Sequence, residues 1–230
     1  MHRQTSIYSK TLSRPFKLLI ISHPTDTIPN MNKSNQQQSL VIIKPDGVQR
    51  SLIGEIVKRY ERVGLKLLAM KMVIPTIQQA RQHYSSDPQW VVKKGQSIIE
   101  KFKAQGKTTS LTDQQLGQNI LDTLIKYITS GPVVVMVWQG TNAIKLIRKI
   151  TGGTEPLTSD VGTIRGDYTL DSYQNADMDN RSVRNLVHAS GSPEEAQTEI
   201  ALWFKPEEIL KYRLIAEQIL YDINLDGILE

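Results

Sequence analysis

The 230-residue sequence contains no cysteine, which excludes disulfides, thiolate metal ligands and cysteine nucleophiles. It also lacks a long apolar run, since LLII at 18–21 and VVVMVW at 133–138 are much shorter than the roughly 20 residues that cross a bilayer. The phosphate-binding patterns GxxxxGKS/T and GxGxxG after a strand are missing as well. These absences favour a globular chain that works in a reducing compartment, without a membrane partner. If the chain binds a nucleotide, it does so without a P-loop.

Positive charge is concentrated at the N-terminus. The net charge is +5, and residues 1–38 hold five cations against one acid, which leaves a net charge of +1 for the rest of the chain. The cations are Arg3, Lys10, Arg14, Lys17 and Lys33, and the acid is Asp26. A nearly neutral remainder does not supply the basic groove that duplex DNA requires. We therefore expect no specific nucleic-acid partner.

Residues 1–38 show neither helical nor strand periodicity and end in the polar run NMNKSNQQQ, which predicts a disordered extension. Two interpretations stay open. A segment with arginine and serine and almost no acids is typical of a transit peptide, which would direct the protein to an organelle. Alternatively, the segment is a non-native or dispensable leader, Met31 is the working start, and the protein is cytoplasmic. We favour the second interpretation.

The chain length and a hydrophobic content of 39% predict one domain, over residues 39–230. Short β-branched runs predict strands at 39–44, 65–75, 132–138 and 182–188. Helical spacing predicts helices at 53–63, 76–84, 95–104, 116–129, 141–150 and 192–204, and one from Pro206 that buries Ile209, Leu210 and Tyr212. Residues 152–168 are predicted as a long loop and residues 85–130 as a helical insertion. The order predicts an α+β fold, a ferredoxin-like βαββαβ antiparallel sheet backed by helices.

One histidine is distinguished by the residues that follow it. His188 ends a predicted strand, the next residues ASGS are small, and Ser192, Pro193 and Glu195 form a helix start. Glu199 lies about two turns into that helix, where its carboxylate can turn back toward the imidazole. A carboxylate that accepts from one ring nitrogen fixes the tautomer and leaves the other nitrogen as a nucleophile. Taken alone, His188 would more simply be a packed strand-end histidine.

Further polar residues could hold phosphates. They are Lys44 at the end of the first predicted strand, Arg148 on the helix after the third strand, Thr154 and Arg165 in the long loop, and Asn185 on the fourth strand. Each also has a simpler explanation. Lysine and arginine are usually solvated at the surface, and Arg165 can pair with Asp167.

Five motifs together resemble the nucleoside diphosphate kinase family. In order, they are IIKPDGVQR (42–50), GPVVVMVWQG (131–140), GTIRGDY (162–168), NLVHAS (185–190) and EIALWFKPEEI (199–209). The resemblance covers most of residues 39–221. It implies a ping-pong phosphotransferase in which a histidine takes the γ-phosphoryl of a nucleoside triphosphate and passes it to a nucleoside diphosphate.

The resemblance also implies roles for individual residues. His188 matches the phosphorylated histidine, Glu199 the glutamate that orients it, and Ser190 a serine beside it. Tyr84 lies near an aromatic that faces the histidine. Positions that hold phosphates and ribose match Lys44, Arg148, Thr154, Arg165 and Asn185. Mg²⁺ is expected as the cofactor, held mainly by nucleotide phosphates and not by a protein metal site, and a homo-oligomer is expected.

Three departures from the family pattern are visible. The segment between Tyr84 and Ser130 is long, and there Trp90 is a candidate to stack on the base as part of a lid over the nucleotide. Ala189 and Gly191 replace a common glycine and aspartate in the catalytic loop. Residues 171–182 enlarge the segment before the active strand, close to surfaces used in family hexamers.

Two other functions are weighed against the kinase. A catalytically silent nucleotide-binding or scaffolding relative would be expected to lack His188, Lys44 or Glu199, and all three are present. A nucleic-acid-binding module would depend on the basic residues 1–38, and its binding would weaken steeply with salt.

Overall fold

The computed structural model describes residues 36–85, 87, 89–104 and 106–221. Among them, four strands form one sheet in the order β2-β3-β1-β4, and every neighbouring pair is antiparallel. The strands are β1 (Gln36–Ile43), β2 (Lys66–Val73), β3 (Val133–Thr141) and β4 (Val187–Ala189). Since β3 lies between β1 and β2, and β1 between β3 and β4, the two βαβ units interleave. The predicted ferredoxin-like α+β fold is confirmed.

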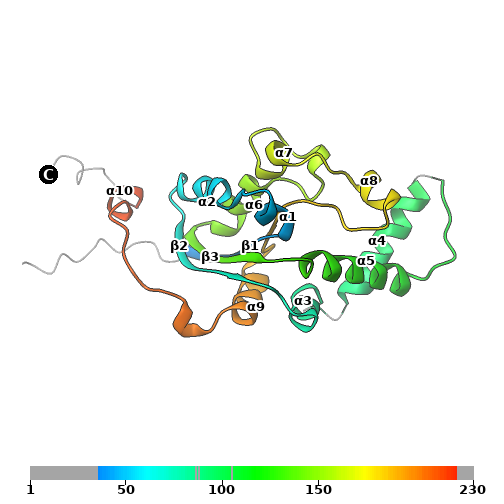
Figure 1. The fold of residues 1–230 in the computed structure, drawn as a ribbon, viewed down its shortest axis with the longest axis horizontal. Helices are drawn as coiled ribbons and strands as arrows, with labels where there is room; N and C mark the ends of the chain where they lie inside the picture. Colours follow the sequence, from blue (N-terminus) through cyan, green and yellow to red (C-terminus); the bar gives the residue numbers. More distant parts are fainter. Residues whose placement is uncertain (1–35, 86, 88, 105, 222–230) are drawn as a thin grey trace, which may run out of the picture. The chain divides into compact units, whose positions relative to one another are not determined.

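Helices cover both faces of this sheet (Figure 1). On one face lie α3 (Ile77–Tyr84), α5 (Asp113–Ile128) and α9 (Pro193–Trp203), and on the other α2 (Ile53–Glu61), α6 (Ala143–Thr151) and α7 (Ile164–Tyr168). Alternate residues of β1 serve the two cores, with Leu40 and Ile42 facing the first and Val41 and Ile43 the second. All four are fully buried. The central strand is therefore fixed from both sides, which fixes the residue that follows it, Lys44.

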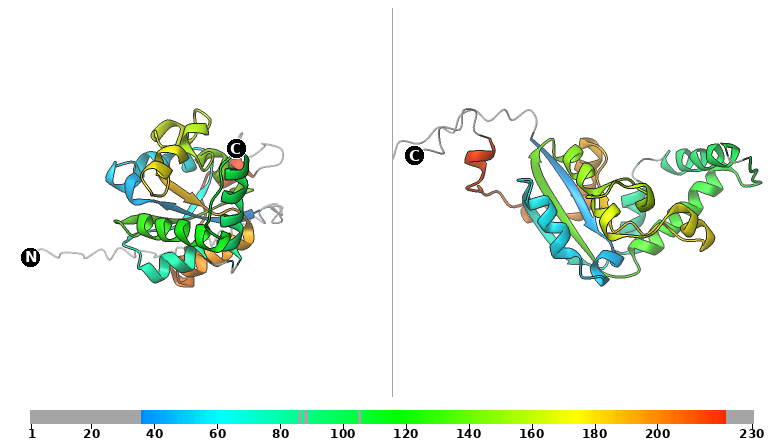
Figure 2. Two further views of the ribbon diagram at one scale, coloured as in Figure 1. Left: turned by 90° about the vertical axis from the view of Figure 1, so that its right-hand side faces the viewer. Right: turned by 90° about the horizontal axis from the view of Figure 1, so that it is seen from above.

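The insertion forms a packed helix pair, as its apolar stripes predict. Helices α4 (Trp90–Ala104) and α5 make extensive contact, and Figure 2 shows the pair projecting from one end of the sheet. Thr112 caps α5 and exchanges hydrogen bonds with Gln115 in a capping box. Two glycines allow the close approach: a Cβ at Gly95 would lie 1.7 Å from the Asp113 carbonyl oxygen, and one at Gly117 would lie 1.8 Å from that of Val91.

Gly117→Ala is therefore expected to lower the free energy of unfolding by about 1–3 kcal/mol, the usual penalty of overpacking. The added methyl group would meet backbone, which can only move with its helix. Thermal unfolding followed by circular dichroism measures the change. Gly54→Ala in α2 is the matched control, because nothing lies within 4 Å of a Cβ there. An equal melting temperature for both variants would show that α4 and α5 separate at no cost.

Several predicted boundaries are wrong. The disordered extension predicted over residues 1–38 is wrong at its end, because residues 36–38 belong to β1, where Gln36 pairs with Thr141 of β3. Residues 1–35 lie outside the described residues. The predicted loop 152–168 contains the short helix α7 and the 3-10 turn η2 (Pro156–Thr158). Two short helices lie where the sequence predicts no element: α1 (Pro45–Gln49) directly after β1, and α8 (Tyr173–Met178) within residues 171–182.

The helix predicted from Pro206 is also wrong. Only the 3-10 turn η3 (Pro206–Glu208) forms, and the chain then follows β2, where the Leu210 N–H donates to the Leu68 carbonyl over 3.0 Å. The Tyr212 hydroxyl donates to the Leu67 carbonyl. Leu210 and Tyr212 are consequently exposed, at 60% and 43%, and only Ile209 packs against the core. A further short helix, α10 (Glu217–Leu220), follows.

Candidate active site

His188 lies on β4 opposite Ile42 of the central strand. Its side chain is 17% exposed, so the imidazole is neither fully packed nor solvated. The strand that carries it is shorter than predicted, with three residues in place of seven. Leu186 causes the difference, since its φ of 63° and the bond from the Val187 N–H to the Asn185 carbonyl (2.6 Å) form a γ-turn that interrupts the ladder.

Glu199 reaches the imidazole from α9, as the spacing predicts. Ser192 caps this helix by accepting from the Glu195 N–H, and Glu199 is buried on its inner face. Its Oε1 lies 2.7 Å from His188 Nε2, and its Oε2 accepts from the Ser190 hydroxyl at 2.6 Å. Because Nε2 is held by the carboxylate, Nδ1 is the ring nitrogen left for chemistry.

Ser190 anchors this pair to the sheet. Its Oγ accepts from the Leu40 N–H over 3.1 Å, and it is fully buried. The carboxylate of Glu199 is thus fixed through one oxygen to β1 and through the other to the histidine. Gly191 stands where an aspartate is common and has no side chain to fix the loop. The loop is held instead by its backbone, because the Gly191 N–H donates to Glu195 Oε2 at 2.7 Å.

A second histidine lies in the site and was missed by the sequence analysis. His83 of α3 packs edge-on against His188 with 4.4 Å between ring centroids. Its Nδ1 accepts from the Trp203 indole over 3.3 Å and lies 3.5 Å from Glu199 Oε1. Burial lowers the pKa of His83 to about 3, so it stays neutral. The only signal was its place beside Tyr84 on one short helix, which does not separate it from a core residue.

Ligand atoms of His83, His188 and Glu199 all lie within 4.8 Å of one another, the only such set of metal-ligating side chains among the described residues. The 2.7 Å between Nε2 and Oε1 is a hydrogen-bond length. Two ligands on a tetrahedral Zn²⁺ would stand about 3.3 Å apart, given bonds of about 2.0–2.1 Å. We therefore interpret the set as the hydrogen-bonded pair of His188 and Glu199 with the ring of His83 packed beside it.

Cations surround this imidazole. Burial lowers the pKa of His188, and the positive charges of Lys44, Arg165 and Arg148 lower it further, while Glu195 raises it. Burial in turn raises the pKa of Glu199. The result at neutral pH is an uncharged ring whose Nδ1 lone pair is available, in a field that attracts anions.

Lys44 is buried, not solvated as the simpler explanation required. It follows β1 at the N-cap of α1, and its Nζ donates to Asn185 Oδ1 over 2.7 Å. The Asn185 amide nitrogen donates in turn to the Thr154 carbonyl at 2.9 Å. The structure thus brings together three of the predicted phosphate and ribose residues, which lie far apart in the sequence.

Arg165 is buried and ties the long loop to β4. Its guanidinium donates to the carbonyls of Gly152 (3.0 Å) and Gly153 (2.8 Å), and to those of Asn185 (3.1 Å) and Val187 (2.5 Å). The last two carbonyls flank the γ-turn residue. The predicted alternative, a pair between Arg165 and Asp167, is wrong.

Asp167 instead pairs with Arg59 of α2 at 2.5 Å. Arg148, on α6, is exposed, and its guanidinium lies beside the loop after His188, since a Cβ at Gly191 would stand 3.7 Å from Arg148 Nη1.

Two aromatic candidates come from α3 and α4. The Tyr84 hydroxyl is buried and has no hydrogen-bond partner among the described residues, and its ring packs edge-on against His83. Trp90 packs against the core cluster between the sheet and α3, α5 and α9, and the Lys94 ammonium lies 5.7 Å over its ring. Stacking of Trp90 on a nucleotide base stays a prediction.

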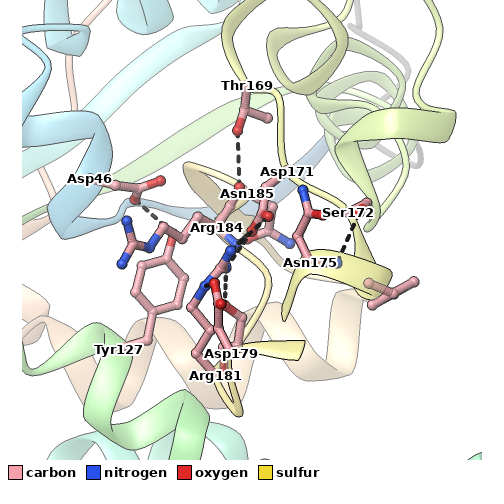
Figure 3. Close-up of polar contacts among 12 residues, drawn as sticks. Asp46, Tyr127, Thr169, Asp171, Ser172, Asn175, Asp179, Arg181, Arg184 and Asn185 are labelled. Atoms are coloured by element: carbon pink, nitrogen blue, oxygen red, sulfur yellow. Dashed lines mark hydrogen bonds and ion pairs between the residues drawn. The ribbon is translucent and has the colours of Figure 1, made fainter. Parts of the chain in front are cut away.

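Hydrogen bonds to the Asp171 carboxylate fix the segment before β4 (Figure 3). No sequence pattern predicts them. Asp171 accepts from Arg181 through both oxygens, at 2.6 and 3.0 Å, and from the Arg184 N–H at 2.6 Å. The pair with Arg181 holds the pKa of Asp171 at about 2. The Ser182 hydroxyl also donates to Thr123 of α5 at 3.0 Å. The enlarged segment 171–182 therefore holds Arg184, the residue before Asn185, and contacts the insertion at Thr123.

Comparison with known proteins points in one direction. The sequence model described as "Nucleoside diphosphate kinase" matches residues 37–93 and 103–209. A nucleoside diphosphate kinase of Pyrobaculum aerophilum is 43% identical over 180 residues, which covers 76% of this chain and 98% of the relative. Nucleoside diphosphate kinase B of Pongo abelii is 37% identical over 189 residues, which covers 82% and 99%.

Solved structures agree with these relatives. The crystal structure of an NDP kinase from Pyrobaculum aerophilum superposes with a TM-score of 0.72 at 41% identity, covering 76% of this chain and all of that one. A transition state mimic of nucleoside-diphosphate kinase from Borrelia burgdorferi, with bound vanadate and ADP, superposes with a TM-score of 0.67 at 35% identity, covering 81% and 97%.

Proposed function

The chain belongs to the nucleoside diphosphate kinase family, and from that premise we propose that His188 is the residue that carries the phosphoryl group. The enzyme moves the γ-phosphoryl of a nucleoside triphosphate to a nucleoside diphosphate through a phosphohistidine in two half-reactions. The silent scaffolding relative is not favoured.

One observation supports His188 most directly. Glu199 occupies Nε2 at 2.7 Å, which orients the ring and leaves Nδ1 as the nucleophile. In the first half-reaction, Nδ1 forms a bond to the γ-phosphorus while the bond to the β-phosphate oxygen breaks, and the nucleoside diphosphate leaves. In the second, a β-phosphate oxygen of the acceptor forms the new bond and the P–N bond breaks. Glu199 stabilises the positive charge that the imidazole gains.

The surrounding cations supply the electrostatic part of catalysis. Phosphoryl transfer spreads negative charge over the oxygens of the transferred group, so fixed positive charges stabilise the transition state. We assign this role to Lys44, Arg148 and Arg165. Thr154 and Asn185, joined by the 2.9 Å bond between them, are assigned to phosphate and ribose contacts. The Tyr84 hydroxyl is a buried donor without a partner among the described residues. We assign it to donate a hydrogen bond to the phosphoryl group once His188 carries it.

Mg²⁺ is proposed to arrive with the nucleotide. Around His188, the described residues place a single carboxylate, Glu199, within the cluster of possible metal ligands, and both of its oxygens are engaged by His188 and Ser190. A hard cation that prefers several oxygens therefore finds them on the phosphates, where it neutralises charge. A homo-oligomer is likewise proposed.

Residues 1–35, on which the choice of compartment depends, lie outside the described residues. None of the described helices has both the length and the apolar character needed to cross a bilayer.

A phosphoenzyme assay tests the assignment of His188. Incubation with γ-labelled ATP and Mg²⁺ is expected to label the protein with a bond that survives alkali and is lost in acid, as a phosphohistidine requires, and peptide mapping should recover the label at His188. His83→Gln is the matched control, because it removes the neighbouring histidine and leaves the nucleophile. Label that is absent from the His188 peptide, or that depends on His83 as the acceptor, would overturn the assignment.

A further inference from the structure

Tyr127 is a residue of the insertion that lies against the phosphate-binding lysine. It stands in the last turn of α5, and the Lys44 ammonium lies over its ring, 5.0 Å from the centroid. Its hydroxyl donates to Asp46 Oδ1 at 2.7 Å, and Figure 3 shows the two side chains facing each other. Neither residue has a role in the function proposed above.

The position of this ring is fixed by α5. Leu121, Ile125 and Ile128 are buried in the core between the sheet and α3, α5 and α9, so one face of the helix cannot turn. The helix ends just before β3, the central neighbour of β1. Tyr127 projects from another face of the same helix and is partly buried. The ring therefore meets Lys44 from a rigid element.

The ammonium of Lys44 needs such support. It has no carboxylate within ion-pair distance among the described residues, and its one hydrogen bond there goes to the neutral amide of Asn185. Charged or titratable groups face it from five elements: Asp46 of α1, His83 of α3, Tyr127 of α5, Arg165 of α7 and His188 of β4. Of these, only Asp46 is an acid.

A cation within about 6 Å of an aromatic centroid is attracted by the face of the ring, more strongly where water is excluded. Tyr127 supplies that face, and its hydroxyl also holds the one acid that favours the charged lysine. Burial and Arg165 lower the pKa of Lys44 to about 7, and Asp46 raises it. The ring of Tyr127 and its hydroxyl, which holds Asp46, therefore both favour the charged form of Lys44 and fix its position.

We propose that Tyr127 is a positioning residue for the phosphate-binding Lys44, holding its ammonium through the ring face and through Asp46. The inference rests on the proposed role of Lys44 in phosphate binding. It also gives the second insertion helix a part in catalysis, because that helix ends at the catalytic lysine.

The test is the pH profile of kcat/KM for ATP with Tyr127→Leu. Lysine is charged below its pKa, and loss of the ring lowers that pKa, so the alkaline limb of the profile should move to lower pH. Above neutral pH, kcat/KM should fall by about 2- to 30-fold, the range of a desolvated cation–π contact, with a smaller loss near pH 6. Tyr127→Phe keeps the ring and should retain most of the alkaline limb.

Tyr212→Leu is the matched control, because the Lys66 ammonium lies 4.8 Å over that ring, away from Lys44. It should leave the profile unchanged. If Tyr127→Leu does not fold, fluorinated phenylalanines at position 127 keep the shape and weaken the ring face stepwise, and the alkaline limb should move with each fluorine. A loss of equal size at every pH, or no response to fluorine, would overturn the proposal.

A double-mutant cycle separates this inference from the function on which it rests. In a Lys44→Met background, Tyr127→Leu should cause no further loss in kcat/KM, because the two residues act as one unit. A full additional loss would show that Tyr127 acts independently of Lys44. Wild-type exchange by Lys44→Met alone would overturn the role of Lys44 itself, whereas labelling of His188 is measured separately.

Discussion

His188→Ala is expected to abolish phosphoryl exchange between ATP and other nucleoside diphosphates while the chain stays folded. The substitution removes the atom that forms the covalent bond, and losses of nucleophiles in comparable enzymes are on the order of 10⁴-fold or more. The fold should survive because the imidazole lies at a strand end, partly exposed and beside small residues. Glu199 keeps its bond to Ser190. Exchange kinetics and a circular dichroism melt measure both parts.

The outcome has a clear opposite. Exchange near the wild-type rate by the purified variant would reject His188 as the nucleophile. Loss of exchange together with loss of the cooperative melt would mean that the fold needs His188, and peptide mapping of the labelled wild-type protein would then decide whether His188 is the nucleophile.

Glu199→Gln should slow exchange on the order of 10- to 10³-fold, as substitutions of orienting carboxylates do. The amide oxygen can still accept from His188 Nε2 and the amide nitrogen can donate to Ser190, so the geometry persists. What disappears is the negative charge that stabilises the imidazole once it carries a phosphoryl group. Rapid-quench measurement of phosphoenzyme formation isolates this step from nucleotide release.

Glu194→Gln provides the comparison for that variant. Glu194 lies in the first turn of the same helix and is exposed, so it removes an equal charge without touching the histidine. It should exchange at the wild-type rate. Equal rates for Glu199→Gln and the wild type would show that the carboxylate contributes position and no charge.

The sequence allowed the order of the sheet and the contact between His188 and Glu199 to be predicted, because both follow from local patterns. Continuous β-branched apolar runs mark the strands, and the serine cap sets where the carboxylate lies on its helix. The cap was observed as predicted, with Ser192 accepting from the Glu195 N–H.

Other parts of the site depend on contacts between distant segments and leave no local pattern. The γ-turn at Leu186 requires a φ of 63°, and a leucine in the sequence does not predict a positive φ. Arg165 donates to the carbonyls on either side of this residue. The chain after Pro206 has helical spacing, but its backbone bonds to β2 instead. His83 and Tyr127 meet the site only because α3 and α5 pack beside it.

The place of β4 beside β1 bears on how the protein is made. A chain that emerges from the ribosome in order can pair β1 with β3 before residues 187–189 exist, but the Lys44 ammonium then still lacks its partner, Asn185. The strand that carries the nucleophile is the last of the four strands to be made. It pairs with β1 through only three residues across a large sequence separation, and contacts of that kind form slowly. We expect an early-terminated or clipped chain to keep most of its core and have no phosphorylatable histidine. Labelling of His188 would therefore report that β4 has been made and has joined the sheet.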